Sequence, residues 1–218
     1  MTNRNEDIML INLDKKDIDI KAVAKKAVKD DKLLDELLGN LWSKKETIRY
    51  NSHKVLLEIC EEQPKVIYGH WDYLVKFLDS DNTYHKLSAV ILLASLTKAD
   101  RQNKFEKIFN KFYDLLNDKS FITAAYVSQV SGKIVLAKPK LETKITNRLL
   151  SIDKTHHQQE RKDLAKASII ETFEEYYPQA KQKKRIVEFV EKQLNCASPK
   201  TRKAAKNFLK RINQTVQN

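Results

Sequence analysis

Two adjacent histidines, His156 and His157, stand just before a carboxylate in the segment DKTHHQQERKD, residues 153–163. His156 and Glu160 are four residues apart, a spacing that would place an imidazole and a carboxylate on one face of a helix. Such a pair could contribute to a metal site or exchange protons. A zinc site needs at least three protein ligands, and the sequence nominates no third ligand for this pair. The spacing alone therefore does not predict a metal centre.

Other catalytic signatures are absent from the sequence. It contains no HExxH motif, no glycine-rich phosphate-binding loop and no serine or cysteine hydrolase signature. Cys60 and Cys196 are far apart and belong to no CxxC pair, so we expect free buried thiols rather than zinc ligands or a disulfide. We predict a protein that is not an enzyme and that needs no cofactor and no metal.

The most aromatic stretch is VIYGHWDYLVKFL, residues 66–78. One set of its residues follows the 4, 3, 4 spacing of a buried helical stripe, which predicts that Trp71 lies in the core. A second set occupies the other face at intervals of four and is a candidate binding surface. The buried set is Ile67, Trp71, Leu74 and Leu78, and the candidate binding set is Tyr68, Asp72 and Lys76.

Basic residues recur at helical spacing further along the chain. Two successive helices could each present a basic ridge to a phosphate backbone or to an acidic protein segment. Aromatic residues are not interleaved with these ridges, as they would be in a platform for single-stranded nucleic acid. The candidate binding residues are Lys140, Lys144 and Arg148 in the first helix and Lys181, Lys184, Arg185 and Lys192 in the second.

Positive charge is concentrated in the C-terminal half. The formal net charge is +12, and Lys plus Arg outnumber Asp plus Glu by 21 to 10 in residues 117–218, against 12 to 10 in residues 43–116 and 8 to 9 in residues 1–42. This asymmetry suggests an anionic partner for the C-terminal half. The alternative is a lysine-rich solvated surface.

The elements that carry these residues are expected to be helices. The chain has 218 residues, 41% of them hydrophobic, but only three glycines and four prolines, too few for the turns of a sheet protein. Amphipathic helical patterns run from about residue 17 onward, interrupted at regular intervals by polar clusters. No window approaches the roughly 20 apolar residues of a membrane span, so we expect a soluble, cytoplasmic protein.

The helical segments repeat. Five of them align on a small residue, and successive small residues are 36, 37, 40 and 40 positions apart. Pro64, Pro139 and Pro178 follow such positions by 12 to 14 residues, and Asp100 takes the same place in one unit. Proline in the first turn of a helix loses no hydrogen bond, so these positions predict where each second helix begins. The aligned small residues are Ser52, Ser88, Ala125, Ala165 and Ala205.

This pattern resembles the HEAT-like (ARM/HEAT) helical repeats. The first helix of such a unit often shows an apolar residue, a basic residue and then small and leucine positions at helical spacing. The resemblance implies an all-α, right-handed α-solenoid of about eleven helices, with second helices lining its concave side. The residues that carry it are Ile48, Arg49, Ser52 and Leu56 and, in part, Thr201, Arg202, Ala205 and Leu209.

We predict a single domain, residues 1–218. It would consist of an N-terminal extension, five helical repeats and a C-terminal capping helix. Their approximate ranges are 1–16 for the extension, 17–42, 43–79, 80–117, 118–153 and 154–195 for the repeats, and 196–218 for the capping helix.

The repeat boundaries suggest helix caps. Ser43 with Glu46 and Thr155 with Gln158 have the spacing of a capping box. On this interpretation the two histidines of DKTHHQQERKD occupy the first helical positions and punctuate a repeat.

Two further residues have packing interpretations. Trp42 lies at a repeat boundary, where we expect an interdigitating hydrophobe. Gly132 lies inside a predicted helix, where glycine costs about 1 kcal/mol relative to alanine. We expect a close helix crossing or a kink at Gly132.

The resemblance favours a non-enzymatic scaffold that binds another protein through its concave surface. The first alternative is DNA or RNA binding through a basic C-terminal groove. The second is a HEAT-like glycosylase for alkylated bases, for which Asp72 and the two tryptophans would be the candidate residues. A HEAT-like di-iron hydroxylase is disfavoured because none of the five histidines is followed by glutamate. We expect no membrane partner and no small-molecule substrate.

Overall fold

The computed structural model describes residues 12–216, and every regular element in that range is a helix. The prediction of an all-α fold is therefore confirmed. The chain divides into two compact units, Met1–Ile67 and Tyr68–Asn218. Residues 1–11 of the predicted extension and residues 217–218 of the predicted capping helix lie outside the described residues.

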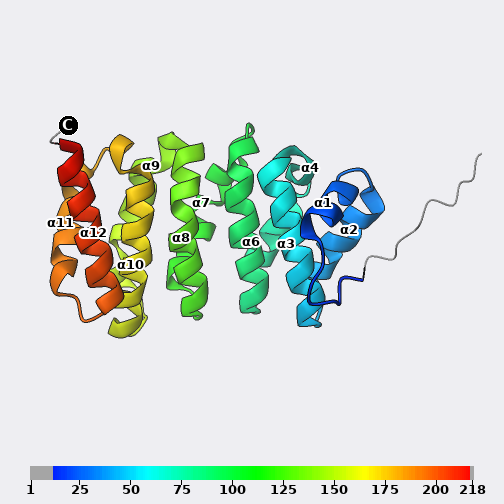
Figure 1. Ribbon diagram of the computed structural model, residues 1–218, viewed down its shortest axis with the longest axis horizontal. Coiled ribbons are helices and arrows are strands. Elements are labelled where there is room, and N and C mark those ends of the chain that lie inside the picture. Colours follow the sequence, from blue (N-terminus) through cyan, green and yellow to red (C-terminus); the bar gives the residue numbers. More distant parts are fainter. Residues whose placement is uncertain (1–11, 217–218) are drawn as a thin grey trace, which may run out of the picture. The chain divides into compact units, whose positions relative to one another are not determined.

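The first unit is built on α3, which packs against α1 and α2 (Figure 1). The buried amide of Asn51 on α3 donates to the backbone oxygens of Leu13 and Lys15 at 2.9 and 2.8 Å, which fixes the segment that leads into α1. Asp19 and Asp30 cap α1 and α2 through backbone N–H groups. The helices are α1 Ile20–Ala27, α2 Asp31–Gly39, the 3₁₀ turn η1 Asn40–Trp42 and α3 Glu46–Glu62, and α4 Pro64–Tyr68 follows.

The second unit contains a layer of long helices, each packed against the next (Figure 1). Each long helix is the first helix of a repeat and brings its buried face to the neighbouring repeat. These helices are α6 Thr83–Leu96, α8 Phe121–Ala137, α10 Gln159–Tyr176 and α12 Pro199–Val216.

Shorter second helices follow the first helices, each closed by a 3₁₀ turn. They are α5 Trp71–Lys76 with η2 Phe77–Asp79, α7 Lys104–Asp114 with η4 Leu115–Asn117, α9 Glu142–Leu150 with η6 Ile152–Lys154, and α11 Lys183–Lys192 with η8 Gln193–Asn195. The turns between a first and a second helix are η3 Thr97–Ala99, η5 Pro139–Leu141 and η7 Tyr177–Gln179.

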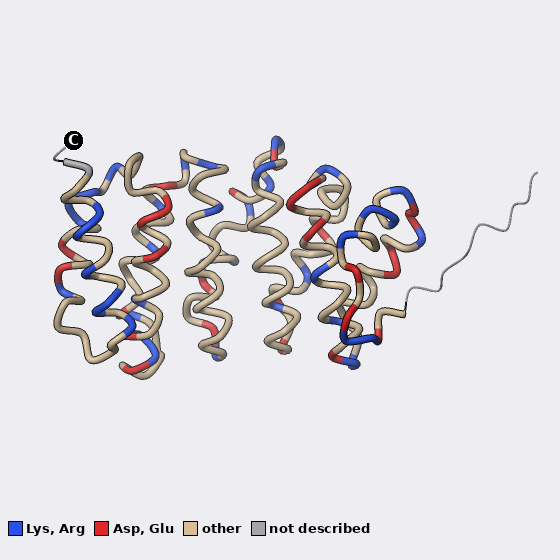
Figure 2. The backbone as a smooth tube through the Cα atoms, in the orientation of Figure 1, with Lys and Arg blue, Asp and Glu red and all other residues tan. Residues whose placement is uncertain are grey.

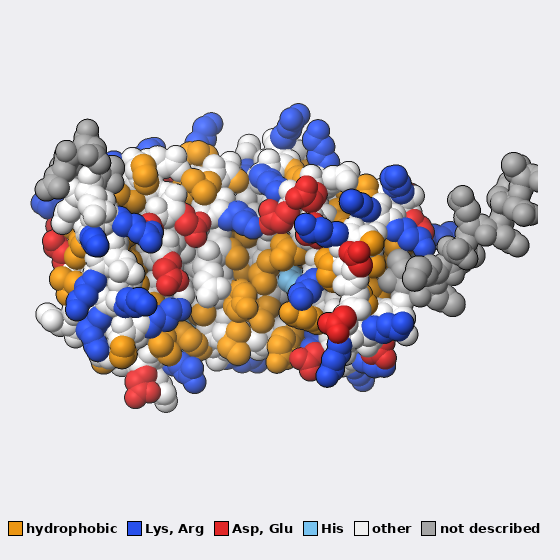
Figure 3. Space-filling view, in the orientation of Figure 1, with side chains coloured by type: hydrophobic (Ala, Val, Ile, Leu, Met, Phe, Trp, Pro, Cys, Tyr) orange, Lys and Arg blue, Asp and Glu red, His pale blue; other side chains and the backbone are white. Residues whose placement is uncertain are grey.

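The helices α6 and α8 have almost no charge. Each carries one lysine, Lys86 and Lys133, and both run tan over most of their length in Figure 2. Their neighbours pack against them from both sides, so an amphipathic stripe is not needed for their burial. Apolar side chains nevertheless reach the surface of this layer around α6 and α8, whereas lysines and arginines gather over α10 and α12 (Figure 3).

Close approach of α8 and α10 accounts for the glycine in α8. Gly132 is buried, and a Cβ atom there would lie 2.1 Å from the Glu175 carboxylate of α10. One turn away, the Thr172 hydroxyl donates to the Ser128 backbone oxygen at 2.8 Å. The close crossing predicted at Gly132 is confirmed.

Two features of the helix pattern differ from the prediction. The described residues contain twelve α-helices rather than about eleven, because Gly69 and His70 form a turn that separates α4 from α5. Glycine has low helix propensity, so the break falls there. Pro64 does begin a helix and Pro139 begins η5, but Pro178 lies in η7, five residues before α11.

The predicted capping boxes are wrong. The helices α3 and α10 begin at Glu46 and Gln159, with Lys45 and Gln158 at their N-caps. Ser43 and Thr155 instead follow the 3₁₀ turns η1 and η6: the Ser43 hydroxyl accepts from the Lys45 N–H at 3.1 Å, and the Thr155 hydroxyl donates to the Ile152 oxygen at 2.8 Å. The 3₁₀ turns use these residues, so each helix starts later than predicted.

Burial agrees with most of the core predictions. Ile67, Trp71, Leu74 and Leu78 are at most 3% exposed, and the predicted small residues other than Ala125 are buried. In the third aligned helix the buried small residue is Ala124, one position earlier. Trp42 is 44% exposed, so its predicted role as an interdigitating core residue is wrong. Both cysteines are buried and free, as expected.

Candidate functional site

Polar side chains join the second helices of the second unit from one repeat to the next. The acid or amide always belongs to the earlier repeat and the cation to the later one. Because the partners are 32 to 38 residues apart, their separation follows the repeat length. The pairs are Asp72 with Lys104, Asp79 with Lys111, Glu106 with Lys138, Asp114 and Asn110 with Arg148, and Asn147 with Arg185.

Two open hollows lie between α7 and α9, and we call them together the α7–α9 groove. Their volumes are about 380 and about 310 Å³, and Arg148 lines both of them. The first is lined by Glu106, Phe109, Asn110, Lys144, Asn147 and Arg148. The second is lined by Tyr113, Asp114, Leu116, Asn117, Arg148, Ser151, Lys154 and Thr155.

Arg148 is held in place by the preceding repeat. Its guanidinium donates to the Asp114 carboxylate at 3.0 Å and to the Asn110 side-chain oxygen at 2.9 Å. Arg185 repeats this arrangement on α11, where it donates to the Asn147 oxygen at 2.6 Å and also contacts Gln182. The structure therefore brings predicted residues of α9 and α11 into one series.

Both asparagines keep an unused hydrogen-bond donor. An arginine occupies the Oδ1 atom of Asn110 and of Asn147, which fixes the orientation of each amide. No described residue accepts a hydrogen bond from either Nδ2 atom. The groove thus presents two amide donors one repeat apart.

The other predicted lysines lie exposed along the second helices. Among the described residues, none of these lysine side chains has an ion-pair partner. They are Lys76 after the middle of α5, Lys140 in η5, Lys144 on α9, and Lys181, Lys184 and Lys192 before or on α11.

Tyr68 and Asp72 belong to a structural cluster at the start of α7. The Tyr68 hydroxyl donates to the Asp100 carboxylate at 2.6 Å, and burial together with this carboxylate raises the pKa of Tyr68 to about 12. Burial opposes ionisation of Asp100, but hydrogen bonds from Lys138, Tyr68 and the first backbone N–H groups of α7 hold its pKa below the usual range. Asp72 pairs with Lys104 at 3.2 Å. Tyr68 is therefore committed to packing between repeats.

The histidine pair of DKTHHQQERKD forms contacts with the preceding repeat. Because α10 begins at Gln159, neither histidine is helical, and the expected alignment of His156 with Glu160 does not occur. The His156 Nδ1 atom lies 2.7 Å from the Asn117 side-chain oxygen, and His157 Nε2 donates to the Leu116 oxygen at 3.2 Å. Burial, and then the neighbouring imidazole, lower the pKa of His157. Within residues 12–216 no group of three or more His, Cys, Asp or Glu side chains is arranged to hold a metal ion.

Sequence reasoning missed the residues that orient the arginines. Asn110, Asp114 and Asn147 were not predicted, because an isolated asparagine or aspartate on a helix has many structural uses. The available signal was the separation of 37 between the two asparagines and of 38 between each asparagine and its arginine. These separations match the repeat length.

A comparison of the chain with family models, with curated proteins and with solved structures finds no match. In the described part of the chain, no helix combines the length and the apolar character that a membrane span requires.

Proposed function

We propose that this protein is a non-enzymatic scaffold of HEAT-like repeats, arranged as an α-solenoid, that binds an extended acidic segment of a partner protein along the α7–α9 groove and onto α11. The observation that carries the proposal is the pair of arginine-oriented asparagines. A side-chain N–H that is fixed in direction and unused within the fold can donate to a backbone carbonyl of an extended chain. Two such donors on successive second helices suit a ligand that crosses from repeat to repeat.

Charge supports an acidic ligand. Interactions between repeats already occupy the acidic residues of α7, because Glu106 pairs with Lys138 and Asp114 pairs with Arg148. Glu142 of α9 is buried and accepts from two threonine hydroxyls. The remaining charges along this groove are unpaired lysines, so an acidic segment would meet a positive surface. They are Lys107, Lys140, Lys144 and Lys154.

Aromatic burial supports protein over single-stranded nucleic acid. Phe109 and Tyr113, the aromatic residues that line the groove, are 9% and 1% exposed. Bases could not stack on rings buried in this way, and stacking is the usual source of affinity for single strands. Duplex binding through phosphate contacts is the second candidate, and the unpaired lysines favour it.

The test compares two double charge reversals. Lys140→Glu with Lys144→Glu changes the groove, and the matched control Lys206→Glu with Lys210→Glu makes the same change in net charge on α12. All four lysines are exposed, so both variants are expected to fold. Each tagged protein is used to capture ligands from nuclease-treated cell extract, and its affinity for a 20-base-pair DNA duplex is measured over a range of salt concentrations.

The proposal predicts a protein that is retained by the wild type and by the α12 variant but lost from the groove variant. Loss of every ligand on nuclease treatment, with duplex affinity that falls steeply with salt and depends on Lys140 and Lys144, would assign the groove to nucleic acid. Equal retention by the two variants would show that the groove is not the binding surface.

A further inference from the structure

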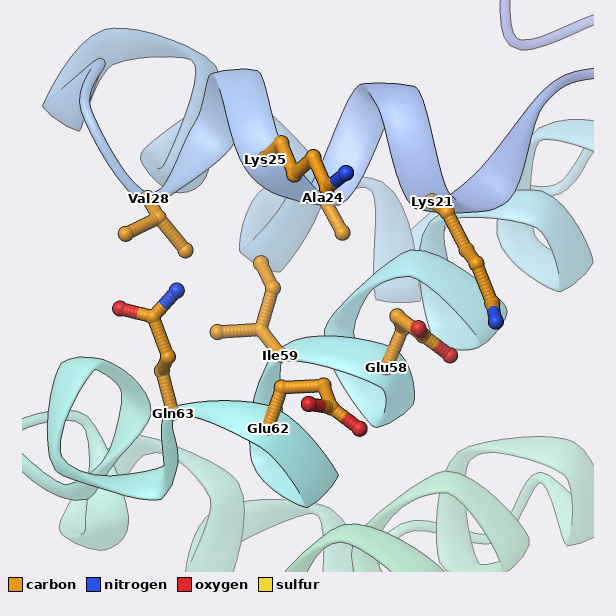
Figure 4. A pocket seen from close by; sticks show the side chains of 8 residues that line it. All are labelled: Lys21, Ala24, Lys25, Val28, Glu58, Ile59, Glu62 and Gln63. Atoms are coloured by element: carbon orange, nitrogen blue, oxygen red, sulfur yellow. The ribbon is translucent and has the colours of Figure 1, made fainter.

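A second candidate surface lies in the first unit, between α1 and α3. A cleft of about 290 Å³ opens there, with Ala24 and Val28 of α1 and Ile59 of α3 at its apolar floor. In Figure 4 the Ala24 and Ile59 side chains point toward each other between the two helices. Both residues are buried, so the floor is formed where the helices pack.

The walls of this cleft carry opposite charges. Lys21 and Lys25 line the α1 side, and Glu58 and Glu62 line the α3 side (Figure 4). On each helix the like charges are four residues apart, an arrangement that destabilises a helix by a few tenths of a kcal/mol. None of the four side chains forms an ion pair with another described residue. The fold therefore leaves two rows of like charge without compensation on the two sides of an apolar floor.

From this pattern we infer that the cleft binds an amphipathic helix of a partner protein. The partner helix would place an apolar row on Ala24 and Ile59, an acidic row along Lys21 and Lys25, and a basic row along Glu58 and Glu62. A helix can present three adjacent rows of this kind, whereas a strand divides successive side chains between two opposite faces. Charges four residues apart on the partner helix also have the same spacing, about 6 Å along the axis, as the charges on the walls. This inference uses no residue of the α7–α9 groove.

The test uses three synthetic 21-residue helical peptides with the same leucine row. In the mixed peptide a glutamate row and a lysine row flank the leucines; in the other two, both rows are glutamate or both are lysine. Binding is followed through the amide chemical shifts of residues 20–28 and 58–63 in the full chain. This measurement excludes peptide that binds to the basic C-terminal half.

The wild type should bind the mixed peptide about tenfold more tightly than either single-charge peptide, because each of these replaces two attractive pairs with two repulsive ones. Lys21→Glu with Lys25→Glu should shift the preference to the all-lysine peptide. Glu58→Lys with Glu62→Lys should shift it to the all-glutamate peptide. Absence of shifts in α1 and α3 with about 1 mM mixed peptide, or a preference that ignores the charge reversals, would overturn the inference.

Discussion

His53 on α3 is expected to reduce the stability of the fold at acidic pH. Its side chain is partly buried, and its Nδ1 atom is inaccessible and has no hydrogen-bond partner among the described residues. Burial lowers the pKa of this imidazole to about 4, from an ordinary value of about 6.5. The folded protein thus resists a proton that the unfolded chain accepts.

The direction and size of the effect follow from this difference. Above pH 6.5 the imidazole is neutral in both states and does not alter the free energy of unfolding. As the pH falls from 6.5 toward 4, the unfolded state binds the proton first, and stability is lost. The loss from His53 amounts to about 2 kcal/mol at pH 5 and about 3 kcal/mol at pH 4.

The assay is urea denaturation followed by circular dichroism at pH 7 and pH 5, for the wild type and for two variants that cannot titrate, His53→Leu and His53→Gln. The two replacements differ in packing and polarity, so their stabilities at pH 7 will differ. Both should nevertheless lose about 2 kcal/mol less than the wild type between the two pH values. Parallel losses in all three proteins, or an NMR titration of His53 with its midpoint above pH 6, would refute the argument.

Two further predictions concern stability and reactivity. Lys138→Met removes the cation that lies 2.8 Å from the carboxylate of Asp100, whose side chain is fully buried. Because a buried charge is left unpaired, the free energy of unfolding should fall by about 3 kcal/mol, while the exposed Lys140→Met should change it by less than about 0.5 kcal/mol. Urea denaturation measures both, and similar values for the two variants would contradict the structural role of Lys138. The buried thiols of Cys60 and Cys196 should react with a thiol reagent in the native protein only at the rate of opening, and rapidly in urea. Immediate reaction of either cysteine in the native protein would contradict its burial.

The candidate site shows where sequence reasoning succeeded and where it failed. The spacing of four in Lys140, Lys144 and Arg148 predicted a shared ridge, and the structure brings Lys144 and Arg148 together in the α7–α9 groove. The spacing did not reveal that Arg148 pairs with Asp114 while Lys144 stays unpaired. Pairing of this kind depends on which residues of the previous repeat lie opposite, and the pattern within one helix does not contain that information.

The chain boundaries show the same limit on a smaller scale. Thr155 and Gln158 have the spacing of a capping box, but the 3₁₀ turn η6 extends the previous helix and uses Thr155. Local propensity favours several starting points for a helix, and packing of the adjoining turn selects one of them.

The sequence by itself determined that the protein is helical, where the repeats recur and that Trp71 is buried, because helical periodicity is a local property of the chain. Only the tertiary structure decided which charges remain available for a partner. The side chains that neutralise one another are about one repeat apart in sequence and meet through packing of successive helices. Arg148 therefore orients Asn110, whereas Lys21 and Glu58 face each other across a cleft without forming a pair.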